Sequence, residues 1–133
     1  MRTNFLLNVS YRQIAVFSSD TESPFNEWSA EQFAAGYAWR PDSVSFSVED
    51  DGDYLVSICL GDDLPSPQYG AAPVIDVPLR TTRSGMIEVA SIADSIFVPF
   101  HGVGIQVLRF ELIRATSDAL PHVFLSMAPG IRG

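Results

Sequence analysis

Along most of the chain, apolar and polar residues alternate with a period of two, which is the pattern of strands that bury one face. The clearest run is residues 44–48, where Val44, Phe46 and Val48 alternate with two serines. Further runs of this kind cover residues 5–9, 10–17, 54–60, 75–80, 87–89, 96–100, 104–112 and 122–127. Eight or nine strand-like runs in one chain favour an all-β fold, a two-layer antiparallel β-sandwich.

One short helix interrupts the strands. Ser29 and Gln32 have the spacing of a capping box, in which each side chain accepts a hydrogen bond from the other residue's backbone N–H. Trp28 and Phe33 flank this cap at the positions of a hydrophobic staple, and Gly36 can end the helix in the left-handed conformation. The predicted helix is about two turns long, which is too short to be stable in water unless it docks on a sheet.

Turn signals predict how neighbouring strands connect. The acidic run Glu49–Asp53 contains Asp-Gly, a pair that tolerates the positive φ of tight turns, so we expect a β-hairpin with an acidic tip. A second hairpin is expected through Thr81–Gly85. Pro78 lacks an N–H and predicts an edge strand, and a shift in the alternation predicts a β-bulge near Val107.

The length of 133 residues fits a single domain spanning residues 1–133. The sequence has no stretch of about 18 consecutive apolar residues, as a membrane span requires, and its N-terminus lacks the features of a signal peptide. The single cysteine, Cys59, lies in an apolar run, where we expect a buried thiol rather than a nucleophile. These features predict a cytoplasmic protein that does not contact a membrane.

The net charge of −8 is unevenly distributed. Between Asp20 and Asp63 there are eleven carboxylates and one cation, Arg40, which gives −10, whereas the rest of the chain has five acids and seven arginines and carries +2. Binding nucleic acid requires Lys or Arg to neutralise phosphates, so the acidic part does not bind it directly. A protein with a basic surface is the natural partner, and the alternative is that the acids only keep the domain soluble.

Candidate catalytic and metal-binding residues are few. His101 and His122 have no second histidine at ligand spacing, and the chain has no C-x-x-C motif, so a zinc site is not predicted. The acidic run lacks the EF-hand pattern, although a loose divalent site that also uses Asp62 and Asp63 stays open. We therefore expect neither an enzyme nor a bound cofactor.

Three aromatic residues cluster near the predicted helix, namely Trp28, Tyr37 and Trp39. They could anchor the helix to a sheet, form an interface hot spot, or provide a stacking platform for a sugar. Trp39 is the best candidate for partial exposure, because Arg40 and Pro41 end the segment.

Four short motifs stand out in the first third of the chain. They are the S-Y-x-Q-x-x-V-F strand (Ser10, Tyr11, Gln13, Val16, Phe17), the W-S pair (Trp28, Ser29), the G-Y-A triplet (Gly36, Tyr37, Ala38) and the aliphatic-S-F strand (Val44, Ser45, Phe46). Together these motifs resemble the ComJ competence family. The resemblance implies that family's known role, which is to bind and inhibit a DNA-entry nuclease.

The sequence thus favours a protein inhibitor that covers the basic nucleic-acid cleft of a nuclease with an acidic surface. Two alternatives stay open: an immunity protein for a different toxin, and a carbohydrate-binding sandwich that uses the aromatic cluster. The candidate partner-binding residues are Glu49, Asp50, Asp51, Asp53, Asp62, Asp63 and Trp39.

Overall fold

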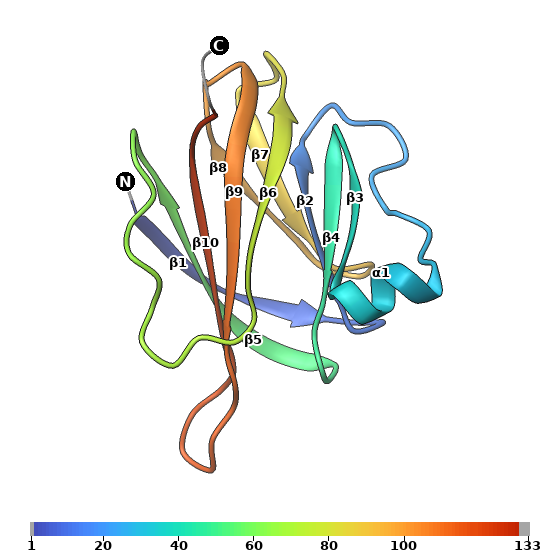
Figure 1. The fold of residues 1–133 in the computed structure, drawn as a ribbon, viewed down its shortest axis with the longest axis vertical. Helices are drawn as coiled ribbons and strands as arrows, with labels where there is room; N and C mark the ends of the chain where they lie inside the picture. The colour runs from blue at the N-terminus through green and yellow to red at the C-terminus, as the bar shows by residue number, and fades with distance from the viewer. Residues whose placement is uncertain (1, 131–133) are drawn as a thin grey trace.

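Ten strands form two sheets that lie face to face in the computed structural model, which describes residues 2–130 (Figure 1). The first sheet has the order β1-β5-β10-β9-β6, with β1 (Arg2–Val9), β5 (Gly52–Leu60), β10 (His122–Pro129), β9 (Gly104–Ile113) and β6 (Val74–Thr81). The second has the order β3-β4-β2-β7-β8, with β3 (Tyr37–Arg40), β4 (Ser43–Ser47), β2 (Gln13–Ser18), β7 (Met86–Ala90) and β8 (Ser95–Pro99). The predicted all-β sandwich is confirmed, with one difference: β5 and β10 pair in parallel.

The core lies between the sheets and is built from the residues that alternate inward. Phe46 of the second sheet and Phe110 of the first are both fully buried, and their rings stack at a centroid distance of 4.4 Å. Such an aromatic pair contributes about 0.5–1.5 kcal/mol beyond the area it buries. Leu7, Val44 and Leu108 belong to the same buried cluster, so the period-two pattern identifies the core-facing side of these strands.

The helix α1 (Ala30–Ala35) forms as its capping signals predict. Gln32 N donates to Ser29 Oγ at 3.2 Å, and Ser29 N donates to Gln32 Oε1 at 2.8 Å. The rings of Trp28 and Phe33 stack at 4.9 Å across this cap, and Gly36 ends the helix at φ 89°. In the described part of the chain no helix is long and apolar enough to span a membrane.

Two connections predicted as hairpins instead carry the chain from one sheet to the other. Residues 48–51 link β4 of the second sheet to β5 of the first, and residues 82–85 link β6 to β7 in the same way. The hairpins that do form join β3 to β4, β7 to β8, and β9 to β10. Turn residues predict that the chain reverses direction, but they do not predict which strand the next one pairs with. A strand with one apolar face can bury that face in either sheet of a sandwich.

The predicted bulge in β9 is absent, and the predicted edge strand is present. Val107 pairs in unbroken register with Pro78 of β6 and Ala128 of β10. The inward positions of β9 include Gln106, which is buried although polar, so the alternation never changes phase. Pro78 lies in β6, which forms an edge of the first sheet, as the missing N–H predicts.

A long connection, residues 61–73, crosses the outer face of the first sheet (Figure 1). Arg109 Nη1 donates to Pro65 O at 2.9 Å, and Gln68 N donates to Glu111 Oε2 at 2.5 Å. Glu111 is thereby 1% exposed although it lies on the outer side of the sheet. The connection therefore covers the part of this face around Glu111, whereas the outward side chains of β1 and β6 are exposed.

Candidate partner-binding surface

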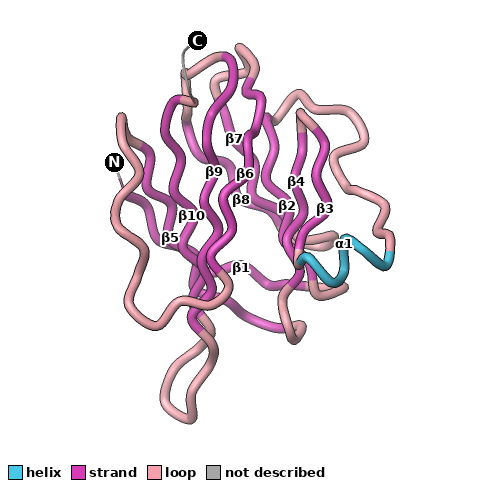
Figure 2. Tube along the Cα trace, viewed as in Figure 1, coloured by secondary structure: helices cyan, strands magenta, loops and turns pink. Residues whose placement is uncertain are grey.

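The acidic loop, residues 49–53, lies at one end of the sandwich, beside the turn between β1 and β2 and the connection between β9 and β10 (Figure 2). All four of its carboxylates, on Glu49, Asp50, Asp51 and Asp53, are exposed. The loop is short because it only has to take the chain from the end of β4 to the start of β5. Crossing between sheets places it at the outer end of both layers.

Hydrogen bonds join the acidic loop to the β1–β2 turn. Arg12 N donates to Asp51 Oδ1 at 2.7 Å, and Val48 N donates to Arg12 O at 3.0 Å. Tyr11 and Arg12 have φ values of 55° and 51°, a left-handed conformation that non-glycine residues rarely adopt. The Asp51 carboxylate therefore holds a turn whose backbone is intrinsically unfavourable.

Two further carboxylates of the loop have partners. Glu49 Oε1 lies 2.8 Å from Arg114 Nη2 in an exposed ion pair, and Asp53 Oδ1 accepts from Asn8 Nδ2 at 3.0 Å. Three of the four carboxylates, on Glu49, Asp51 and Asp53, are thus held by contacts within the protein.

The contacts also change the local charge. Four carboxylates give the loop a formal −4, and the ion pair with Arg114 reduces this to −3. An exposed ion pair such as Glu49 with Arg114 has a net effect of about 0–1 kcal/mol on stability. The surface is therefore acidic, but less so than the sequence of the loop alone indicates.

An aromatic groove of about 560 Å³ adjoins one side of the acidic loop. Its walls include Tyr11, Trp28 and Phe33, and Glu49 lies at its border with the loop. Tyr11 is 74% exposed and Phe33 is 63% exposed, whereas Trp28 is half-buried and donates from Nε1 to Gln13 Oε1 at 3.1 Å. Exposed aromatic side chains beside charged groups are typical of interface hot spots.

A second groove, of about 430 Å³, adjoins the other side of the loop. Tyr54 lies in it and donates its hydroxyl to Asp50 O at 2.7 Å. Burial raises the pKa of the Tyr54 hydroxyl, and the neighbouring loop carboxylates raise it further, so the hydroxyl stays protonated at neutral pH. Leu112, Leu120 and Pro121 supply apolar surface to the same groove.

Sequence reasoning missed the exposed aromatic residues of this end. Tyr11 was interpreted as part of a strand and Phe33 only as half of a helix staple, yet both are among the most exposed large hydrophobic side chains. The usable signal was Tyr11-Arg12, where the alternation stops before it resumes at Gln13.

The other predicted binding residues lie elsewhere. Asp62 and Asp63 follow the far end of β5, whose nine residues separate them from the acidic loop by roughly 30 Å at ~3.3 Å per residue. Trp39 lies where β3 approaches β6; it is 40% exposed, and its Nε1 donates to Pro78 O at 2.6 Å. The structure therefore does not gather the predicted residues into one surface.

The three aromatic residues considered as a stacking platform have different environments. Trp28 stacks on Phe33, Tyr37 packs against the hydrophobic core, and Trp39 bridges to the backbone of β6. They do not form a common exposed plane.

No group of three or more His, Cys, Asp or Glu side chains within residues 2–130 is arranged to hold a metal ion. Ser57 Oγ and His122 Nε2 lie 2.7 Å apart, and burial, together with the charge of Arg2, lowers the pKa of His122. Cys59 is half-buried, so it is more accessible than the apolar run predicts.

Comparison with known proteins gives one family and two solved structures. The family model for competence protein J (ComJ) matches residues 6–123. The crystal structure of ComJ from Bacillus subtilis, described as an inhibitor of the DNA-degrading activity of NucA, superposes with a TM-score of 0.80 at 20% identity, covering 96% of each chain. A protein described as crocagin biosynthetic gene J has a TM-score of 0.66 at 14% identity over 98% of each chain. None of the curated protein sequences matches significantly.

Proposed function

Because the chain belongs to the competence protein J family, we propose that it is a protein inhibitor that binds a DNA-degrading nuclease. The match over residues 6–123 is the observation that carries this proposal, because it spans nearly the whole sandwich. The family relative ComJ from Bacillus subtilis is described as an inhibitor of NucA. An inhibitor acts by occupying its target and requires no catalytic residues of its own.

The acidic loop and the aromatic groove together form the binding end in this proposal. A nuclease has to present cationic groups to DNA phosphates, and an exposed carboxylate surface complements them. Charge alone gives little affinity, which comes mainly from buried aromatic anchors. Tyr11 and Phe33 supply such anchors next to Glu49, so one end of the molecule offers both steering charge and contact area.

An inhibition assay with a matched pair of variants tests this assignment. DNA degradation by the nuclease encoded nearest to this gene is titrated with the chain and with its Tyr11→Ala and Tyr69→Ala variants. Both tyrosines are exposed and lie outside the strands, but Tyr69 lies on the connection that crosses the first sheet. We expect inhibition by the native chain, and roughly 30-fold weaker inhibition after Tyr11→Ala, as a hot spot of about 2 kcal/mol implies. Tyr69→Ala should inhibit like the native chain.

Two results would contradict the proposal in different ways. If both variants lose inhibition equally, or if neither loses any, the acidic loop and the aromatic groove are not the surface that binds the nuclease. Full nuclease activity at every concentration of native chain would favour the alternatives, an immunity protein for a different toxin or a carbohydrate-binding sandwich.

A further inference from the structure

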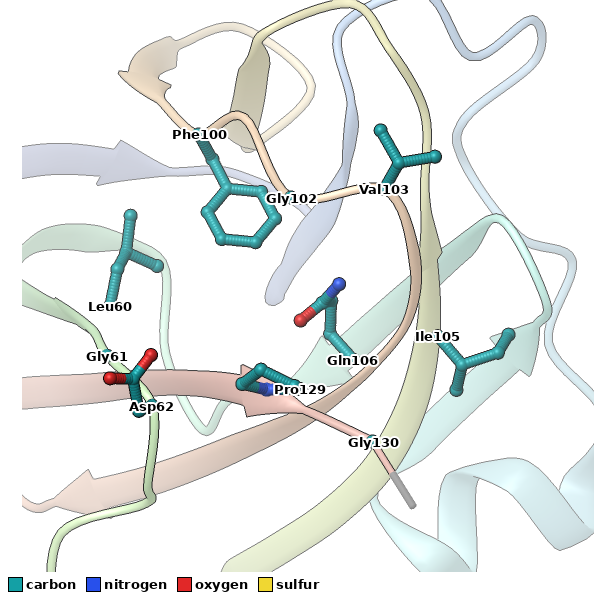
Figure 3. Close-up of a pocket in the computed structure, with 10 residues that line it drawn as sticks. All are labelled: Leu60, Gly61, Asp62, Phe100, Gly102, Val103, Ile105, Gln106, Pro129 and Gly130. Carbon is teal, nitrogen blue, oxygen red and sulfur yellow. The ribbon is translucent and has the colours of Figure 1, made fainter. Parts of the chain in front are cut away.

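A pocket of about 620 Å³ lies where β5 ends, which is the end of the sandwich opposite the acidic loop. Figure 3 shows the residues that line it. It is formed where β5 ends, β9 begins and β10 ends, together with the connection between β8 and β9. Its volume is within the range of about 300–1,000 Å³ that is usual for small-ligand sites. The lining residues that matter here are Leu60, Asp62, Phe100, Ile105 and Gln106.

Gln106 is the unusual member of this set, because its polar side chain is 4% exposed on the core-facing side of β9. Its Nε2 donates to Thr81 Oγ1 at 3.3 Å, and Thr81 Oγ1 in turn donates to Gly102 O at 2.8 Å. The Thr81 hydroxyl thus accepts one of the two amide hydrogens and orients the amide. Gln106 Oε1 has no hydrogen bond within residues 2–130 and points toward the space beside Phe100 and Leu60 (Figure 3).

The pocket offers acceptors for a polar ligand group and apolar surface for the rest of it. Asp62 contributes an exposed carboxylate, and Gln106 contributes an amide oxygen that faces the pocket from an otherwise buried side chain. Within residues 2–130 the pocket lining includes no Lys, Arg or His. Leu60, Phe100 and Ile105 provide apolar contacts. The ring of Phe100 also suits a cation, which is attracted to an aromatic face.

We propose that this pocket binds a guanidinium or ammonium group carried on an apolar stem. The cation pairs with the Asp62 carboxylate and donates to Gln106 Oε1, and the stem packs between Phe100 and Leu60. The same chemistry is presented by a basic side chain of a peptide and by a free organic cation. The site is separate from the acidic loop, so it stands or falls independently of nuclease inhibition.

Chemical-shift titration of the full chain tests the proposal with defined probes. The probes are acetyl-arginine amide, as a model of a peptide side chain, agmatine, as a free cation, and acetyl-citrulline amide, as the uncharged analogue. We expect shifts concentrated at the amides of Gly61, Gly102 and Gly130, with a cationic probe and not with citrulline. Binding only of acetyl-arginine amide indicates a peptide ligand, and tighter binding of agmatine indicates a free cation.

Variants assign the two acceptors. Asp62→Asn should weaken binding of the cationic probe at least about tenfold, the range of a charge-assisted hydrogen bond, and Gln106→Met, which conserves volume, should also weaken it. The neighbouring Asp63→Asn, outside the pocket, should bind like the native chain. Equal affinity for the citrulline and arginine probes, no shifts at millimolar probe, or an Asp62→Asn variant that binds as well as the native chain would each overturn the proposal.

Discussion

The carboxylate-bearing residue Glu88 lies on β7 between two aromatic residues of the neighbouring strands. Phe17 of β2 and Phe97 of β8 are its cross-strand partners, and no ion pair to Glu88 is found within residues 2–130. Burial raises the pKa of Glu88, because desolvation disfavours the charged form. The alternation pattern predicts which residues face outward, but it cannot show which of them are screened from water by their neighbours.

This environment makes stability depend on pH in a defined direction. A raised pKa means that the folded state binds the proton more tightly than the unfolded state does. The free energy of unfolding therefore falls as the pH rises above 4.5, the ordinary pKa of a glutamate, toward the higher pKa that Glu88 has in the folded state. Glu88→Gln should therefore stabilise the protein at pH 7 and give no gain at pH 3.5, where both states are protonated. Urea unfolding at the two pH values measures this. An equal effect at both pH values would contradict it.

At the scale of elements, the β4–β5 connection and the β1–β2 turn act as one unit. The hydrogen bonds of Arg12 with Asp51 and Val48 hold the left-handed turn against the acidic loop. The helix could be predicted from sequence because its cap, staple and terminating glycine lie within nine residues of one another. The inter-sheet connections could not, because strand pairing depends on residues far away in the chain.

Variants of Asp51 test the hydrogen bond between the β1–β2 turn and the acidic loop. Asp51→Ala removes the acceptor of Arg12 N in an exposed hydrogen bond, and we expect a loss of about 0.5–1.5 kcal/mol in the free energy of unfolding. Asp51→Asn keeps an oxygen at the same place and should lose much less. Chemical denaturation of both variants decides this, and a similar loss in both would show that charge rather than the hydrogen bond holds the turn.

At the scale of the whole molecule, the acids of residues 20–63 are spread over both ends of the sandwich. Asp42 lies in the turn between β3 and β4, and Asp62 follows β5, whereas the acidic loop lies between β4 and β5. Strands run from end to end, so successive connections alternate between the ends. The net charge of the segment could be counted from the sequence. Its distribution over the two ends of the sandwich could not be predicted without knowing the order and direction of the strands.

The two ends also differ in chemistry. One combines the acidic loop with exposed aromatic residues, and the other has a pocket lined by acceptors and apolar side chains. The motif residues predicted the family, and Tyr11 belongs to them, but its 74% exposure was not visible in the sequence. In the proposed function the nuclease binds at the first of these ends, which leaves the second end free.

The most direct measurement is the association rate with the nuclease, by stopped flow, at ionic strengths from 0.1 to 1 M. The account predicts that Glu49→Gln with Asp50→Asn slows association about threefold or more at low salt, because charges at the rim of an interface act on encounter. Glu22→Gln with Asp63→Asn removes the same charge outside the acidic loop and should have little effect. Salt should erase the difference, since the Debye length falls from ~10 Å to ~3 Å. Equal slowing by the two double variants, or an association rate independent of salt, would contradict the claim that the acidic loop guides the nuclease to this end.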